Sequence, residues 1–309
     1  MFMTRWLKTA VATTVLMLGL LPAGAAHAAP SSKPTTGGYV VGWGNDRYGQ
    51  ATPPPGLSDV KAIAAGNQHS LALRSDGTVV GWGLNDKGQA TPPPGLSGVT
   101  AIAANFDYSL ALKSDGTIVG WGANDYGVTT PPAIPDVIAI SAGYTHALAL
   151  RSGGGIVGWG SNIYGESSTP PGLWTGVKAI AGGWTNSLAL RTDGTVVFWG
   201  DTSYGQEVPI PPALSGVKAI TNSLIHSMAL KLDGTVTAWG YNHTGQANMP
   251  QGLSGIKAIS VGSQHSMALK NDGRVVAWGD NSEGQSKPPG LSNITSISAG
   301  GMHSLALIG

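Results

Sequence analysis

The sequence predicts an all-β fold: a seven-bladed β-propeller that closes by pairing of the N-terminal strand into the last blade. Three observations support this prediction: a regular repeat, three short strand patterns in each repeat, and chain ends that complement each other. The dipeptide Trp-Gly marks the repeat, with successive spacings of 39, 39, 38, 40, 40 and 39 residues. A fixed period in this range is typical of repeat architectures. The tryptophans concerned are Trp43, Trp82, Trp121, Trp159, Trp199, Trp239 and Trp278.

Each repeat contains three segments with strand character. In the first complete repeat these are residues 60–65, 70–74 and 78–82, which are rich in small apolar and β-branched side chains. Asp76-Gly77 joins the second segment to the third, and Asp-Gly is a strong hairpin signal because both residues can take positive φ. Proline-rich segments such as 52–56 cannot donate hydrogen bonds to a central strand pair. We therefore expect them to form a weak outer strand or a loop to the next repeat.

The chain ends predict closure of the ring. The last repeat stops at residues 304–309, without its third strand, whereas the first repeat material, residues 38–44, is a third strand without the two before it. An open solenoid would need polar caps at both ends. Complementary halves instead predict that the N-terminal strand completes the final blade.

The first 28 residues have the features of a secretory signal peptide. Arg5 and Lys8 precede a short apolar run, and Ala26-His27-Ala28 provides a small-x-small cleavage site. We expect a signal peptide at residues 1–28, a flexible leader at 29–36 and the propeller at 37–309. The apolar run is shorter than the roughly 18 residues of a membrane helix. The sequence therefore predicts a secreted, extracellular protein without a membrane span.

Composition excludes several function classes. Without Arg5 and Lys8, 15 of the 17 basic residues remain against 16 acidic residues, which gives a net charge of −1. This balance offers no basic surface for a phosphate backbone, so we expect no nucleic-acid partner. Cysteine is absent, which rules out disulfides, thiol nucleophiles and thiolate metal ligands. The fold must therefore be stabilised by packing.

Four recurring motifs resemble a known family. They are Val-Lys-Ala-Ile-Ala-Ala-Gly, His-Ser-Leu-Ala-Leu, Asp-Gly-Thr-Val-Val-Gly-Trp-Gly and Gly-Gln-Ala-Thr-Pro-Pro. Together they resemble the repeats of the regulator-of-chromosome-condensation family, over residues 37–309. The short loops and the signal peptide look more closely like those of the secreted propeller-type β-lactamase inhibitory proteins. That resemblance implies a propeller whose aromatic and acidic loop residues contact an enzyme.

Strand direction predicts which loops share a face. In an antiparallel meander the first and third strands run the same way, so the loops that follow them emerge together. Aromatic and acidic residues concentrate in these loops, whereas the opposite face carries only Trp174. Such a composition is expected of a protein-binding surface. The predicted partner-binding residues are Tyr48, Phe106, Tyr126, Tyr144, Tyr164, Trp184, Tyr204, Tyr241, Asp46, Asp107 and Asp125.

Two interpretations of these aromatics stay open. Tyrosine precedes the glycine in four of the Trp-Gly loops, so these rings could simply pack on the neighbouring blade. Phe106, Tyr144 and Trp184 differ, because the matching positions in other repeats hold residues such as Asn67 and Gly301. The fold does not require an aromatic there, which favours a binding role. Leu224, Ile225 and Met302 are expected to add aliphatic surface to the same face. The pattern departs from that of the inhibitor family at Lys87, Thr244 and Glu283.

Catalytic or metal chemistry is not indicated. One repeat position holds five histidines, but residues at one position of a propeller are separated by whole blades, so they cannot converge on a metal. We expect them to form hydrogen bonds at the start of a strand. No nucleophile elbow, zinc-protease motif or phosphate loop is present. We expect no catalytic residues, no metal and no cofactor. The histidines are His69, His146, His226, His265 and His303.

Taken together, these features predict a secreted, monomeric, non-catalytic propeller that binds a protein. Its sharpest form is an inhibitor of class A serine β-lactamases that covers the active-site mouth with the aromatic loop face. The alternative is a lectin-like propeller that binds carbohydrate or cell wall, because exposed aromatic rings also stack on sugars. A lectin would be displaced by a free glycan, which separates the two hypotheses.

Overall fold

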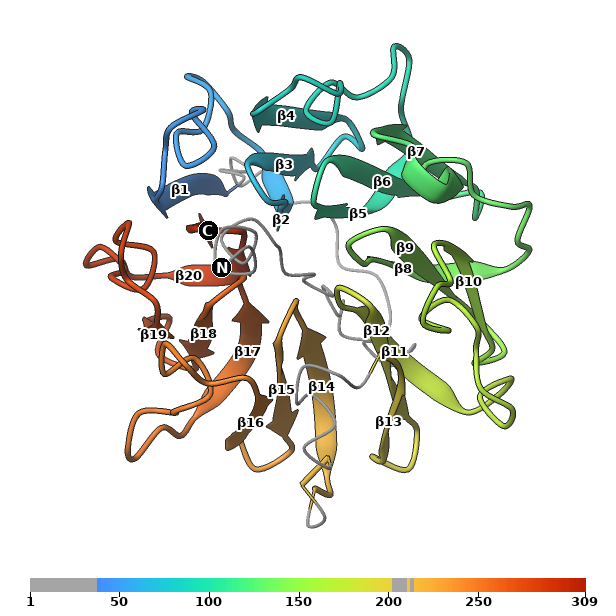
Figure 1. Cartoon of the computed structure of the whole chain (residues 1–309). Coiled ribbons are helices and arrows are strands. Elements are labelled where there is room, and N and C mark those ends of the chain that lie inside the picture. Colours follow the sequence, from blue (N-terminus) through green and yellow to red (C-terminus); the bar gives the residue numbers. More distant parts are fainter. Residues whose placement is uncertain (1–37, 202–209, 212–213) are drawn as a thin grey trace, which may run out of the picture.

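The computed structural model describes residues 38–201, 210–211 and 214–309. The predicted signal peptide (1–28) and leader (29–36) lie outside this part. The described residues form seven three-stranded antiparallel sheets around a central axis, which confirms the seven-bladed β-propeller (Figure 1). The strands of the seven blades, in order, are β2 (Val60–Ala65), β3 (His69–Arg74), β4 (Val79–Gly83); β5 (Val99–Asn105), β6 (Tyr108–Lys113), β7 (Ile118–Gly122); β8 (Val137–Ala142), β9 (His146–Arg151), β10 (Ile156–Gly160); β11 (Val177–Gly182), β12 (Asn186–Arg191), β13 (Val196–Gly200); β14 (Val217–Asn222), β15 (His226–Lys231), β16 (Val236–Gly240); β17 (Ile256–Val261), β18 (His265–Lys270), β19 (Val275–Gly279); and β20 (Ile294–Ala299), β21 (His303–Ile308), β1 (Tyr39–Gly44).

The seventh blade joins the two ends of the described chain. The N-terminal strand β1 pairs antiparallel with β21, from Tyr39 opposite Ile308 to Gly44 opposite His303. In Figure 1, the blue strand β1 lies beside the red C-terminal strands. Gly38 also forms an antiparallel bridge to Val60 at the start of the first blade. The N-terminal strand therefore completes the last blade, as the sequence predicts.

The first strand of each blade lines the central axis. Each of these strands contacts the first strand of the next blade, and β20 contacts β2, so the inner ring is complete. Every first strand also has a register shift at its second residue, as between Val60 and Ala62. Such a β-bulge increases the local twist. Small residues such as Ala62 and Ala64 are buried here, where the strands approach one another most closely.

Among the described residues, the main hydrophobic core consists of seven clusters, one between each pair of neighbouring blades. Each cluster combines aliphatic residues of two blades with one tryptophan from the third strand of the later blade. Trp121 of the second blade, for example, packs with Leu71 and Ala64 of the first. Trp43 of β1 packs with Met267 and Leu269 of the sixth blade. The tryptophans are thus inter-blade fillers, and both surfaces of each sheet are largely buried.

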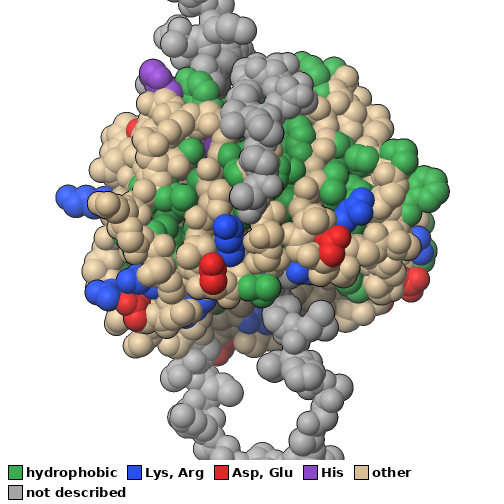
Figure 2. Space-filling model, turned by 90° about the horizontal axis from the view of Figure 1, so that it is seen from below, with side chains coloured by type: hydrophobic (Ala, Val, Ile, Leu, Met, Phe, Trp, Pro, Cys, Tyr) green, Lys and Arg blue, Asp and Glu red, His purple; other side chains and the backbone are tan. Residues whose placement is uncertain are grey.

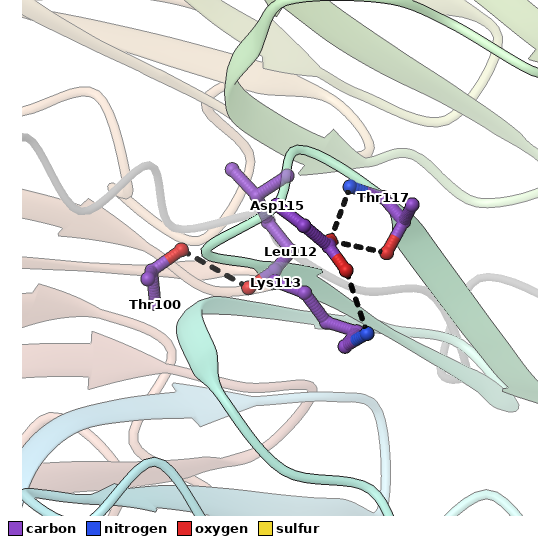
Figure 3. Close-up of polar contacts among 5 residues, drawn as sticks. All are labelled: Thr100, Leu112, Lys113, Asp115 and Thr117. Atoms are coloured by element: carbon purple, nitrogen blue, oxygen red, sulfur yellow. Dashed lines mark hydrogen bonds and ion pairs between the residues drawn. The ribbon is translucent and has the colours of Figure 1, made fainter.

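The Asp-Gly turns differ in detail from the prediction. Gly77 has φ of +83°, but Asp76 is not among the non-glycine residues with positive φ. The amide of Gly77 donates to the carbonyl of Arg74, so the glycine alone takes the left-handed conformation after a tight turn. The aspartate acts through its side chain. In the equivalent turn of the second blade, the carboxylate of Asp115 accepts hydrogen bonds from the amide and the hydroxyl of Thr117 (Figure 3).

Lys113 and Thr100 complete this turn. The Lys113 ammonium lies 2.9 Å from the Asp115 carboxylate, and the Thr100 hydroxyl donates to the carbonyl of Leu112 (Figure 3). The bonds from Thr117 and Lys113 hold the pKa of the Asp115 carboxyl well below its usual range. The turn is therefore fixed by side-chain hydrogen bonds as well as by the glycine.

The proline-rich segments run outside the blades as loops, since the described residues show no fourth strand in any sheet. Charges on the side of the propeller that Figure 2 shows are mixed, with Lys and Arg side chains lying among Asp and Glu side chains. Among the residues described, no helix is long and apolar enough to cross a membrane.

Candidate functional site

Two sets of loops emerge together, and we call the surface they form the loop face. One set follows the first strand of each blade and the other follows the third strand. The amide of Leu84, after β4, donates to the carbonyl of Gln68, which lies between β2 and β3. The same bond joins Ala123 to Asp107 in the second blade. The predicted pairing of loops is therefore correct.

Three aromatic side chains of successive blades contact one another on the loop face. The ring centroids of Phe106 and Tyr144 lie 4.1 Å apart, and those of Tyr144 and Trp184 lie 5.8 Å apart in an edge-to-face arrangement. All three side chains are half-buried. We call them the central aromatic cluster. Each stands in the loop between the first and second strands of its blade, so blades two, three and four place their rings side by side.

Leu224 and Ile225 differ from the expectation that they would add aliphatic surface. Each has only 1% of its surface exposed. They form a small hydrophobic cluster against which Tyr144 and Trp184 pack. The prediction of exposed aliphatic surface is wrong for these two residues, because the neighbouring aromatic rings cover them. Met302, on the seventh blade, remains partly exposed.

The tyrosines of the Trp-Gly loops lie on the same face with exposed rings. The exposed fraction ranges from 38% for Tyr241 to 60% for Tyr126, with Tyr48 and Tyr164 between them. Tyr204 lies outside the described residues. These rings do not extend the central aromatic cluster into a continuous stack, although Tyr126 lines a pocket together with Phe106 and Tyr144.

The loop backbone does not depend on the tyrosine rings. The residue two positions further on accepts a hydrogen bond from the tyrosine amide: Gln50 from Tyr48 at 2.8 Å, and Glu166 from Tyr164 at 2.7 Å. The same bond forms where the residue is not aromatic, from Lys87 to Gln89 and from Glu283 to Gln285. The buried glutamine, or Glu166 in the blade of Tyr164, holds the loop whichever side chain stands in the tyrosine position. That side chain is therefore available for contact with a partner.

Tyr126 is an exception with strained backbone. Its blade has Val128 in place of the glutamine, and residues Asp125–Gly127 form a short 3-10 turn in which Tyr126 has φ of +60°. Non-glycine residues rarely adopt this left-handed conformation, and it is enriched at functional sites. The ring of Tyr126 is the most exposed of the four described loop tyrosines.

The predicted acidic residues behave differently from one another. Asp107 is half-buried beside the central aromatic cluster, and burial together with the charges of Asp86 and Asp125 raises its pKa to about 6. Burial also raises the pKa of Tyr144 to about 12, with a contribution from Asp107 and Asp125. Asp46 is elsewhere: its carboxylate accepts bonds from the amide of Ala51 and the hydroxyl of Thr52, inside its own loop.

The five repeated histidines are buried in the interfaces between blades. Nε2 of His69 lies 2.9 Å from the Ser109 hydroxyl of the next blade, and that hydroxyl donates to the carbonyl of Gln89. The indole Nε1–H of Trp121 donates to the same carbonyl of Gln89. Because the serine hydrogen is used in this way, His69 must donate from Nε2 and carry no hydrogen on Nδ1. Burial lowers the pKa of His69 to about 3.

The other four histidines repeat this arrangement, which confirms the expected hydrogen-bonding role. Burial lowers the pKa of His226 and His303 to about 3, and that of His146 and His265 to about 4. Gly66 allows the ring of His69 to lie close, since a Cβ there would come within 2.3 Å of the imidazole. Within the described residues, no group of three or more His, Asp and Glu side chains is arranged to hold a metal ion.

Two repeats replace histidine and show how the network adapts. Tyr108 stands in the histidine position of the second blade, and its hydroxyl donates to the carbonyls of Gly143 and His146. The third blade then has Ala147 where the other blades have serine. The tyrosine thus reaches backbone carbonyls of the third blade, whereas the imidazole of a histidine repeat bonds a serine hydroxyl of the next blade. In the fourth blade, Asn186 accepts a bond from Asn222 of the fifth.

Five segments of the chain match the regulator of chromosome condensation (RCC1) repeat: residues 60–89, 99–128, 137–166, 177–206 and 256–285. Five repeats of this chain are therefore RCC1 repeats. Each matched segment begins with the first strand of a blade and ends at the position of the loop glutamine. Sequence similarity to curated proteins is lacking, since none of them matches the chain.

Solved structures place this RCC1-repeat protein among known propellers. Prp20p from Saccharomyces cerevisiae, which has binding properties to Gsp1p and histones, is similar with a TM-score of 0.73 and 19% identity, over 88% of this chain and 92% of that one. Human WBSCR16 has a TM-score of 0.70 and 16% identity, over 88% and 99%. The ectodomain of the Arabidopsis thaliana receptor kinase ACR4 has a TM-score of 0.63 and 20% identity, over 79% and 91%. These similarities establish the fold.

Some residues of the RCC1 repeats were not singled out from the sequence. The buried loop glutamines follow glycine at the same place in most repeats, and this regularity is the signal that marks them. A serine follows the histidine in four of the five histidine repeats, whereas Ala147 follows His146. Because Ala147 stands in the blade next to that of Tyr108, this replacement signals a contact between the two blades. The opposite face carries two exposed aromatic residues. One is the predicted Trp174, whose exposed fraction is 72%, and the other is Tyr39 at the start of β1.

Proposed function

We propose that this protein is an exported, non-catalytic binding protein whose loop face docks onto another protein. The observation that carries the proposal is the central aromatic cluster. Phe106, Tyr144 and Trp184 stand at a loop position where the other repeats have no aromatic residue, and they contact one another. Aromatic anchors of this kind, partly buried and rimmed by polar groups, are typical of interface hot spots.

The proposal of a non-catalytic role is supported by how the histidines are used. All five are fully buried between blades, where each Nε2 bonds a serine hydroxyl. A substrate on the loop face could not reach them. The similarity to Prp20p, which binds Gsp1p and histones, supports a propeller that works by binding proteins.

The most specific form of the proposal is inhibition of a class A serine β-lactamase. Its support is the resemblance of the repeats, the short loops and the N-terminal segment to the secreted propeller-type β-lactamase inhibitory proteins. The loop face would lie over the mouth of the enzyme's active site and exclude substrate sterically, without supplying a reactive group. An interface of standard size, roughly 1,600 Å², with a few aromatic hot spots would reach nanomolar affinity.

Titration tests this proposal. The protein lacking residues 1–28 is titrated against a panel of class A β-lactamases, and hydrolysis of a chromogenic substrate is followed. We expect stoichiometric inhibition of at least one enzyme. Replacing Phe106, Tyr144 and Trp184 together by Ala should weaken inhibition by about a hundredfold or more. The matched control is Trp174→Ala, which removes an equally large and more exposed ring from the opposite face and should leave inhibition unchanged.

The outcomes separate the levels of the proposal. Absence of inhibition across the panel at micromolar concentration would remove the β-lactamase assignment. Capture of a different protein from culture medium, lost in the triple variant and kept with Trp174→Ala, would support the broader binding role. Retention on polysaccharide that free glycan reverses would favour the lectin instead. Export is tested separately, by N-terminal sequencing of the secreted protein, which should begin at Ala29.

A further inference from the structure

A pocket of about 410 Å³ opens on the loop face between the second and third blades. Three aromatic rings form much of its wall: Phe106 and Tyr144, which belong to the central aromatic cluster, and Tyr126 from the Trp-Gly loop. Two carboxylates, Asp107 and Asp125, line it as well. The pocket therefore combines flat apolar walls with negative charge. Two other surface pockets, one beside Met302 and one beside Ile134, lack this combination.

The carboxylates of this pocket form no ion pair with another described residue. None of the four ion pairs found among the described residues involves Asp107 or Asp125. The charged groups that act on Asp107 are Asp86 and Asp125, which repel its negative charge, and the exposed Lys87, which attracts it. Two acidic neighbours against one basic neighbour leave the pocket electronegative. An incoming cation would relieve that repulsion.

Backbone strain occurs at the same place. Tyr126 has φ of +60°, whereas the other non-glycine residues with positive φ in the described chain are Asp and Asn residues. Asp and Asn tolerate this conformation well, but an aromatic residue does so at a cost. Val128, which replaces the loop glutamine, also lines the pocket. The second blade thus departs from the repeat in the backbone conformation of Tyr126 and in the residue type at Val128. Both residues line the pocket.

We propose that this pocket binds the guanidinium group of an arginine side chain that the protein partner presents. This inference rests on the proposed protein-binding function and names the chemistry of one contact within it. A guanidinium is planar, stacks on aromatic faces and pairs with a carboxylate through two parallel hydrogen bonds. The ring walls supply the stacking surface, and Asp107 supplies the carboxylate. A lysine ammonium would use the charge but not the flat walls.

The test uses the protein without its partner. Side-chain NMR signals of the aromatic residues are followed while N-acetyl-L-arginine amide is added, and N-acetyl-L-citrulline amide serves as the neutral probe of the same shape. We expect saturable shifts with the arginine probe in the millimolar range and at least tenfold weaker binding of the citrulline probe. Asp107→Asn should weaken arginine binding at least tenfold. The matched control, Asp136→Asn, removes the same charge from an exposed position on the opposite face and should bind as the unaltered protein does.

Binding should also depend on pH, because the Asp107 carboxyl with its pKa of about 6 must be ionised. Raising the pH from 6 to 7.5, a range in which the protein stays folded, should strengthen arginine binding about twofold. Absence of binding at 50 mM probe, equal binding of citrulline, or unchanged binding by Asp107→Asn would each overturn the proposal. Equal binding of N-acetyl-L-lysine amide would overturn the assignment to guanidinium. None of these results depends on β-lactamase inhibition, so the two proposals can fail independently.

Discussion

Acid should unfold this propeller because it protonates the buried histidines. His69 and its four equivalents are neutral in the folded protein, with pKa values lowered to about 3 or 4 from the ordinary 6.5. The unfolded chain binds protons at these residues below pH 6.5, and the folded protein does not. Stability is therefore complete above about pH 7 and falls as the pH drops toward 4. The direction follows because the unfolded state gains the protons.

The magnitude follows from the number of histidines. Each contributes a slope of about 1.4 kcal/mol per pH unit once the unfolded state is protonated. At pH 5 the loss is about 2 kcal/mol for each histidine, or on the order of 10 kcal/mol for the five. Since domains are typically stable by about 5–15 kcal/mol, the fold should be marginal near pH 5.

Urea denaturation at pH 7.5, 6.5, 5.5 and 5.0 measures this effect. The dependence of the unfolding free energy on pH should correspond to uptake of four to five protons near pH 5.5. A variant with His265→Tyr and Ser304→Ala copies the natural pair of Tyr108 and Ala147, and it should take up about one proton fewer. Stability that stays constant between pH 7 and pH 5 would refute the reasoning, because it would mean that the histidines are not held neutral.

Two further predictions concern packing. Trp82→Ala removes a filler between the seventh and first blades and should cost about 3–5 kcal/mol of unfolding free energy in urea denaturation, whereas the exposed Trp174→Ala should change it by less than about 0.5 kcal/mol. A Trp82 variant as stable as Trp174→Ala would contradict the inter-blade role. Deleting residues 38–44 removes β1 and leaves β21 as an open edge, so the protein should unfold at a lower temperature and aggregate. Calorimetry measures the melting temperature and light scattering detects the aggregation. An unchanged melting temperature would argue against closure through β1.

The sequence was sufficient to predict the blades because the physical constraint repeats. Each blade buries both of its surfaces, so every strand carries apolar residues, and each interface needs one large filler such as Trp121. The complementary ends then specified closure. Details that depend on one pair of residues were harder. The sequence did not determine whether Asp76 has positive φ. The turn is also stabilised by a hydrogen bond from the Thr78 amide to the Asp76 carboxylate, which does not require positive φ.

The loop face was predicted in composition but not in depth. Strand direction placed Phe106, Tyr144 and Trp184 on one side, yet it gave no information on which residues cover others. Leu224 and Ile225 occupy equivalent loop positions and are buried because rings from neighbouring blades lie over them. The pocket beside Asp107 is lined by Val128 and Tyr126. The sequence shows Val128 in place of the glutamine, but only the structure shows that Tyr126 has positive φ and that both residues lie beside Asp107.

The glutamine-held loops have a consequence for how such a protein can change its target. Because Gln50 and its equivalents fix the main chain through a bond to the amide two residues earlier, the side chain at that earlier position can vary without altering the scaffold. Natural diversity or a directed library could therefore alter affinity at several places around the ring while the stability of the molecule is set elsewhere, in the layers between the blades. Recognition and folding would then be free to evolve almost separately.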